Sequence, residues 1–141
     1  MSDADLGRER LIAAALSAQK NAYAPYSNFC VGASLLTVGG DLFVGCNVEN
    51  ASYGLTICAE RAVASAAVAG GSKEFATLAI ASPGAVPPCG ACRQYLSEFN
   101  SALAILLIDV DCPDAIVETT LDVLFPQPFR AGGVSDGKID L

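Results

Sequence analysis

The chain has 141 residues, which suits one domain with one substantial core, and 52% of them are hydrophobic. Its formal net charge is −7 and it has no run of lysine or arginine. We therefore expect no binding to nucleic acid or to anionic membranes, since both require a basic surface. No apolar run approaches the roughly 20 residues that span a bilayer. This composition favours a small, neutral or weakly charged substrate.

The first predicted element is an amphipathic helix over residues 6–18, where apolar residues recur at helical spacing. Its apolar stretch 11–16 follows two arginines, an order that also occurs in secretion signals. Asp3, Asp5 and Glu9 outnumber those arginines, whereas a secretion signal begins with a positive region. We therefore expect that this segment is a helix of the folded domain, not a secretion signal, and that the protein is cytoplasmic.

The next segments predict a hairpin followed by a helix. Two extended segments, 29–38 and 41–47, flank a Gly-Gly-Asp turn and are rich in residues that favour strands. An irregular segment over 50–56 then precedes an alanine-rich helix over 58–69, which Gly70 and Gly71 end.

In the second half, strands alternate with helices, which predicts crossover connections and a partly parallel sheet. The predicted elements are a strand at 77–81, a helix at 90–99, strands at 103–109 and 115–119, and a helical turn at 121–125. The complete order predicts an α/β fold with three layers, α/β/α. A mixed five-stranded sheet carries helices on both faces, in a single domain over residues 1–141.

Three cysteines form the most informative pattern: Cys58 in a Cys-Ala-Glu segment, and Cys89 and Cys92 in a Pro-Cys-Gly-Ala-Cys segment. A structural zinc site uses four protein ligands, whereas a catalytic one leaves a position open for water. The chain contains no histidine, so any zinc must bind sulfur or carboxylate. Three thiolates with Glu60 close by therefore predict a catalytic zinc site in which Glu60 exchanges protons.

These cysteines stand at the starts of predicted helices, where unpaired N–H groups and partial positive charge favour thiolate over thiol. Three thiolates leave a zinc ion with a formal charge of about −1, which weakens its ability to acidify water. Arg61 is the candidate to offset that charge by donating hydrogen bonds to the ligand sulfurs. Taken alone, Glu60 would be an ordinary acid in a first helical turn, and Arg61 an ordinary surface arginine.

Two other interpretations of the cysteines stay open at this point. A CxxC pair is typical of redox proteins, but a redox pair leaves Cys58 and Glu60 without a role. A structural zinc site would need a fourth ligand, for which Cys46 and Cys112 are candidates. Otherwise these two cysteines, like Cys30, are expected to be small buried hydrophobes.

Several stretches match a known family: AYAPYSNFCVGA (22–33), GCNVENASYGLTICAERA (45–62), PCGACRQ (88–94) and PQPF (126–129). With these the chain resembles the small homotetrameric cytidine deaminases over about residues 5–129, and residues 130–141 form a tail outside the pattern. Many deaminases share the zinc pattern, whereas the Asn-Val-Glu-Asn stretch is what points to a nucleoside.

The resemblance implies one Zn²⁺ per subunit on Cys58, Cys89 and Cys92, with Glu60 as the proton shuttle. The implied reaction is the hydrolytic deamination of cytidine and 2′-deoxycytidine to uridine and 2′-deoxyuridine with release of ammonia, a step of pyrimidine salvage. The rivals are deamination of another cytosine nucleoside such as blasticidin S, editing of a polynucleotide, and a non-catalytic, zinc-stabilised binding module. The Asn-Val-Glu-Asn stretch argues against the first rival, and the acidic charge argues against the second.

The resemblance also implies substrate contacts: Asn47 and Glu49 to the ribose hydroxyls, Phe29 to the pyrimidine ring, and the backbone around Ala59 to the edge of that ring. Residues two apart on an extended segment point the same way, and their donors and acceptors suit two hydroxyls. Without the resemblance, Asn47 and Glu49 would read as a polar strand end and Phe29 as a core residue.

Finally, the resemblance implies a homotetramer in which neighbouring subunits complete each site, with Tyr53 and Phe129 as the contributing side chains. The high apolar fraction agrees with surface that is buried between subunits.

Overall fold

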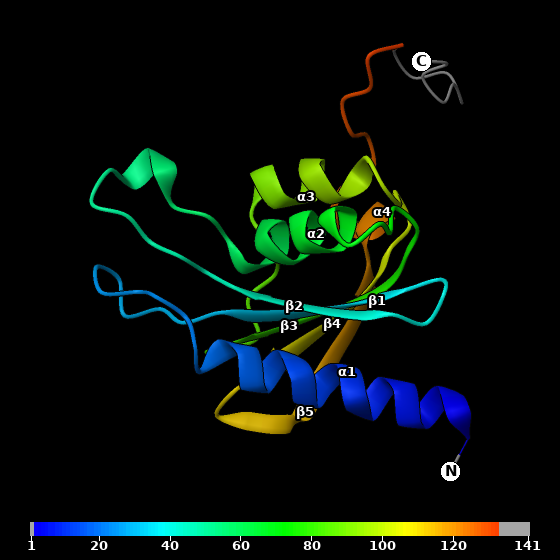
Figure 1. The fold of residues 1–141 in the computed structure, drawn as a ribbon, viewed down its shortest axis with the longest axis horizontal. Helices are drawn as coiled ribbons and strands as arrows, with labels where there is room; N and C mark the ends of the chain where they lie inside the picture. Colours follow the sequence, from blue (N-terminus) through cyan, green and yellow to red (C-terminus); the bar gives the residue numbers. More distant parts are fainter. Residues whose placement is uncertain (1, 133–141) are drawn as a thin grey trace.

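The computed structural model describes residues 2–132, so residues 133–141 of the expected tail lie outside the described part. A central sheet separates two helical layers (Figure 1). Helix α1 (Asp3–Gln19) covers one face, and α2 (Ala59–Ala69) with α3 (Gly90–Ser97) covers the other. A 3-10 turn, η1 (Tyr53–Leu55), and a short helix, α4 (Leu121–Leu124), complete the helical elements of this part. The predicted three-layer α/β/α architecture is confirmed.

The sheet is mixed, with its five strands in the order β2-β1-β3-β4-β5. The strands are β1 (Gly32–Thr37), β2 (Leu42–Cys46), β3 (Phe75–Ser82), β4 (Ala104–Asp109) and β5 (Cys112–Thr120). Strands β3 and β4 are parallel and are joined across α3, whereas the other neighbouring pairs are antiparallel. Both the predicted hairpin and the predicted crossover are therefore present. Within residues 2–132, every helix is too short or too polar to cross a bilayer.

The first strand begins later than the sequence predicts. We expected it to start at Phe29, but β1 begins at Gly32. The side chain of Asn47 explains the difference, because its oxygen accepts from the Val31 N–H at 2.9 Å and its Nδ2 donates to the Phe29 carbonyl at 2.7 Å. Together with the backbone bond from the Asn47 N–H to the Val31 carbonyl, at 3.1 Å, these side-chain bonds hold the segment beside the end of β2.

The core has two parts, one on each face of the sheet. Along β4, Ile105 and Leu107 face the layer of α2 and α3, whereas Leu106 and Ile108 face α1. This alternation buries the strand on both faces, which explains why its sequence is an uninterrupted apolar run. The predicted buried strand is confirmed, and α2 and α3 are held rigidly above the sheet.

Helix α2 packs closely against strand β2 at Gly45. A Cβ atom at this position would lie 2.7 Å from the backbone nitrogen of Val63 and 3.1 Å from the carbonyl oxygen of Ala59. Only glycine therefore allows this helix, which begins just after Cys58, to sit so close to the sheet.

We expect Gly45→Ala to lower the free energy of unfolding by about 1–3 kcal/mol, because the added methyl must push backbone atoms of α2 away. Chemical denaturation measures the change. Gly7→Ala is the matched control: a Cβ at Gly7 meets no atom within 4 Å, and removing a glycine from helix α1 should stabilise the protein by about 0.5–1 kcal/mol. Equal stability of Gly45→Ala and the wild type would contradict the close packing at Gly45.

Candidate metal centre and substrate cavity

The sequence-predicted site residues meet in a cavity of about 290 Å³ beside the N-termini of α2 and α3. Cys58, Ala59, Glu60 and Cys89 line one part of it. The rest of its wall comprises Ser27, Phe29, Val31, Asn47, Glu49, Thr56, Ile80, Ser82, Val86 and Pro87. Segments far apart in the sequence therefore enclose one space of the size of a small molecule.

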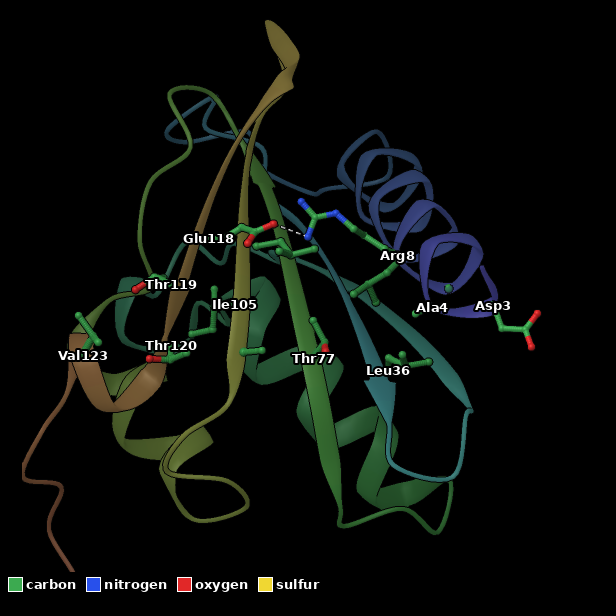
Figure 2. A pocket seen from close by; sticks show the side chains of 14 residues that line it. Asp3, Ala4, Arg8, Leu36, Thr77, Ile105, Glu118, Thr119, Thr120 and Val123 are labelled. Carbon is green, nitrogen blue, oxygen red and sulfur yellow. Dashed lines mark ion pairs between the residues drawn. The ribbon is translucent and has the colours of Figure 1, made fainter. Parts of the chain in front are cut away.

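A second, larger cavity of about 740 Å³ lies between α1 and the strands β4 and β5 (Figure 2). Its rim carries the ion pair between Arg8 and Glu118, at 2.5 Å, and its walls include Leu36, Thr77 and Ile105. None of the sequence-predicted site residues lines it. Size alone therefore does not locate the chemistry of this protein.

Cys58 and Cys89 are the N-cap residues of α2 and α3, and neither side chain makes a capping hydrogen bond to a backbone N–H group of its helix. Cys92 lies one turn into α3 and is fully buried. The three sulfurs lie within 4.8 Å of one another, with 4.0 Å between Cys58 and Cys89 and 3.5 Å between Cys89 and Cys92. Two helix N-termini thus deliver three thiols to one point.

This cluster fits a zinc ion. Two sulfurs about 2.3 Å from a tetrahedral zinc lie about 3.8 Å apart, close to the separations observed. Among the residues that the structure describes, the cluster contains these three side chains and no fourth histidine, cysteine, aspartate or glutamate. Cys112 is exposed on β5 and Cys46 lies in β2, so neither is the fourth ligand of a closed structural site.

Arg61 supplies positive charge directly to this cluster. Its Nη2 donates to the sulfur of Cys58 at 3.5 Å, and its buried Nε has no hydrogen-bond partner. Hydrogen bonds from Cys92, Arg61 and Cys89 lower the pKa of Cys58 to about 5. The hydrogen bond between Cys92 and Cys58 raises the pKa of Cys92, and the hydrogen bond between Arg61 and Cys58 raises the pKa of Arg61. Cys58 therefore ionises more readily than an ordinary thiol, and the cause is its hydrogen bonds within the cluster and with Arg61.

Glu60 lies in the first turn of α2 and is only 5% exposed. Burial raises the pKa of its carboxyl group, and the negative charge of Cys58 raises it further, while a hydrogen bond with Cys92 acts in the opposite direction. A buried carboxyl group with a raised pKa that shares a cavity with the cysteine cluster is a candidate to take up and release a proton.

Asn47 and Glu49 line the same cavity but are already partly bonded. Asn47 uses one donor and one acceptor on the backbone of the 29–31 segment. The carboxylate of Glu49 accepts from the N–H groups of Tyr26 and Ser27 and from the hydroxyl of Ser27. These bonds lower the pKa of Glu49, the Ser27 hydroxyl most of all. Both side chains are therefore fixed before any ligand arrives.

The structure also places the other sequence-predicted residues. Phe29, 37% exposed, and the buried Ala59 line the cavity, whereas Tyr53 and Phe129 do not. The side chains of Tyr53 and Phe129 are 76% and 78% exposed. Two hydrogen bonds of 3.0 Å join the Gln94 side chain to the backbone of Phe129. Within one chain, then, Tyr53 and Phe129 remain at the surface.

Some wall residues escaped the sequence reasoning. Ser27 and Thr56 lie inside the matching stretches, two positions before Phe29 and Cys58. Their polar side chains could therefore have been predicted to line the site from the sequence. Ile80 and Ser82 at the end of β3 carried no signal, because their sequence reads as an ordinary buried strand.

The fold and this site together define a zinc-binding deaminase domain: a three-thiol centre and a buried glutamate at the N-termini of two helices above a mixed sheet. Accordingly, the chain belongs to the family described as the cytidine and deoxycytidylate deaminase zinc-binding region, whose model matches residues 7–107. The zinc cofactor of that family and the fit of the Cys58, Cys89 and Cys92 cluster agree.

Individual relatives match over nearly their whole length. A cytidine deaminase of Sporosarcina psychrophila is 44% identical over 90% of this chain and 94% of its own. One from Halalkalibacterium halodurans is 40% identical over 93% of this chain and 100% of its own. The crystal structure of a cytidine deaminase from Burkholderia pseudomallei superposes with a TM-score of 0.81 and 43% identity, covering 92% of this chain and 100% of that one.

We expect Cys89→Ser to abolish stoichiometric zinc binding, because two thiolates cannot replace three at this centre. Atomic emission spectroscopy of the purified protein measures the zinc content. Cys112→Ser is a matched control, since both cysteines are exposed but Cys112 lies outside the cluster, and it should retain the wild-type zinc content. A Cys89→Ser protein with wild-type zinc would exclude this centre.

Proposed function

We propose that this protein is a cytidine deaminase, which converts cytidine and water into uridine and ammonia. One observation carries the proposal: a single cavity holds the cysteine cluster and the buried Glu60 together with Asn47 and Glu49. The cysteine cluster and Glu60 suit chemistry at a nucleobase, whereas Asn47 and Glu49 suit hydrogen bonds to the hydroxyls of a sugar. Membership of the deaminase family and the names of the full-length relatives support the same reaction.

When bound to Cys58, Cys89 and Cys92, zinc supplies a Lewis acid that lowers the pKa of water. We assign the proton transfers to Glu60. It accepts a proton from the attacking water and delivers it to ring nitrogen 3 of the cytosine. It then accepts the remaining proton of that water, now a hydroxyl on ring carbon 4, and delivers it to the amino group, so that the carbon–nitrogen bond breaks, ammonia leaves and the carbonyl of uridine forms. Its raised pKa, caused first by burial, suits a group that must hold the proton between these steps.

Arg61 is assigned to charge compensation. Its hydrogen bond to the Cys58 sulfur draws negative charge away from the thiolate cluster. A less negative cluster leaves the metal a stronger Lewis acid, so we place Arg61 as a support of the reaction rather than as a group that touches the substrate.

The sugar end of the cavity supports activity on both cytidine and 2′-deoxycytidine. An ionised carboxylate offers about four acceptor positions, and three protein hydrogen bonds to Glu49 leave about one. Asn47 retains one donor and one acceptor. One sugar hydroxyl can donate to Glu49 and accept from Asn47, so a second hydroxyl is not required. We assign Phe29 and the backbone at Ala59, which line the same cavity, to contacts with the pyrimidine ring.

The cavity wall also bears on the rival functions. It contains two carboxylates, Glu49 and Glu60, and neither lysine nor arginine. Such a wall repels phosphate and argues against a polynucleotide substrate. A non-catalytic zinc module would be expected to close its coordination sphere with a fourth side chain, and the cluster provides three.

We expect Glu60→Gln to keep the fold and the zinc but to lose at least about a thousandfold in kcat, because an amide cannot relay the protons. Ammonia release from cytidine measures activity, with 2′-deoxycytidine, blasticidin S and a cytosine-containing oligonucleotide in parallel. The wild type should turn over only the first two. Activity of the Glu60→Gln protein close to that of the wild type would refute the shuttle, and an inactive, zinc-loaded wild type would refute the function.

We further propose a homotetramer in which Tyr53 and Phe129 complete the cavities of neighbouring subunits. The segment 48–57, which projects beyond the sheet in Figure 1, exposes several apolar side chains. These are Val48, Tyr53, Leu55 and Ile57. So much exposed apolar surface on one segment favours burial against another chain.

Light scattering tests the assembly. The expected mass is four times the 14.4 kDa of the chain. Replacing Tyr53 by alanine should raise KM for cytidine, since the side chain would contact a neighbour's substrate. A monomeric mass for the active wild type would contradict the proposal.

A cytoplasmic location is part of the same proposal. All six cysteines of the chain lie in the described part and all are free thiols. Free thiols in this number suit a reducing compartment.

A further inference from the structure

The hydroxyl of Ser27 joins two parts of the cavity wall that lie apart in the sequence. It donates to Oε2 of Glu49 at 2.5 Å and accepts from the backbone N–H of Phe29 at 3.0 Å. Its single proton and one of its lone pairs are thereby committed. Ser27 itself lines the cavity, as do Phe29 and Glu49. The serine therefore links the base end of the cavity to its sugar end.

Among the described residues three groups donate to the Glu49 carboxylate, and of these the Ser27 hydroxyl alone donates to Oε2. The backbone N–H groups of Tyr26 and Ser27 both donate to Oε1, at 2.9 and 3.1 Å. Removing the hydroxyl would keep Oε1 anchored and release Oε2. A carboxylate held at one oxygen can rotate about its terminal torsion, which is broad, so its free acceptor position would lose its fixed direction.

The charge of Glu49 depends on the same contact. The Ser27 hydroxyl is the main cause that lowers the pKa of this carboxyl group, and the two backbone N–H groups add to it. A sugar hydroxyl donates more strongly to a carboxylate than to a neutral acid. Ser27 thus favours both the direction and the charged state that a hydroxyl ligand needs.

We infer that Ser27 is a positioning residue for the nucleoside sugar, which it orients through Glu49 without bonding to the substrate itself. This inference rests on the proposed deaminase function. It predicts that Ser27 contributes to binding only when the substrate carries the sugar hydroxyl that Glu49 accepts. Such a contribution is equal in the ground state and the transition state, so it changes KM and leaves kcat in place.

The test compares Ser27→Ala with the wild type on two substrates, cytidine and 2′,3′-dideoxycytidine, which lacks the secondary hydroxyls. For cytidine we expect KM to rise about tenfold with kcat within about twofold, the size of one oriented hydrogen bond. For 2′,3′-dideoxycytidine we expect KM to stay within about twofold. Ser65→Ala is the matched control, because its hydroxyl bonds to Tyr95 at 2.9 Å outside the cavity wall, and it should leave both KM values unchanged.

Two results would overturn the inference. An unchanged KM for cytidine would remove Ser27 from sugar binding. An equal rise in KM for both substrates would mean that the serine merely shapes the loop before Phe29. KM does not depend on the fraction of active protein, so partial unfolding of the variant does not blur the comparison. Ser27→Thr and Ser27→Val introduce side chains of nearly equal shape that differ in the hydroxyl, and Ser27→Val should show the higher KM for cytidine but not for 2′,3′-dideoxycytidine.

A double-mutant cycle identifies Glu49 as the intermediary. Once Glu49 is replaced by alanine, which removes both acceptor oxygens, adding Ser27→Ala should raise KM for cytidine by less than about twofold further. A full second rise would show that Ser27 acts independently of Glu49 and would overturn the inference. Failure of the proposed function is recognised separately, because the zinc-loaded wild type would then release no ammonia from cytidine.

Discussion

The site depends on one constraint, the convergence of two helix N-termini on a single point above the sheet. Cys58 caps α2 and Cys89 caps α3, and both leave their side chains free of cap hydrogen bonds. Each helix start brings partial positive charge and unpaired N–H groups, which offset the cost of gathering thiolates in one place. The parallel crossover from β3 through α3 to β4 and the close approach of α2 at Gly45 hold the two helices in this position.

The same convergence explains the electrostatics of the cavity. Burying Glu60 beside a thiolate cluster raises the pKa of its carboxyl group, which costs stability whenever the group is ionised. Arg61 opposes this cost by donating to Cys58 from the same helix. The acid and base that we propose, Glu60, therefore lies beside a cation and beside a cluster that could hold a metal, and both would balance a charge that the core alone would exclude. At the proposed sugar end the carboxyl group behaves in the opposite way: Glu49 is half-buried, and its hydrogen bonds stabilise it as an anion.

Much of the candidate site could be predicted from the sequence, because most of its chemically active side chains lie in a few short segments. Three cysteines, one glutamate and no histidine restrict the metal chemistry before any fold is known. The limits are equally physical. Phe29 was assigned to a strand because its neighbours favour strands, but the side chain of Asn47 binds the backbone there and delays β1 to Gly32. Bonds between residues about twenty positions apart, such as those from Ser27 to Glu49, leave no local signature in a sequence.

By itself, then, the sequence determined the element order, the buried central strand and the candidate metal-binding and proton-carrying groups, since periodicity and side-chain chemistry are local properties. Only the tertiary structure decided that Cys58 meets Cys89, that Asn47 and Glu49 face the same cavity as Glu60, and that Ser27 holds Glu49. These relations arise from the packing of two helices on a mixed sheet. That packing depends on contacts between distant segments, and no single segment contains it.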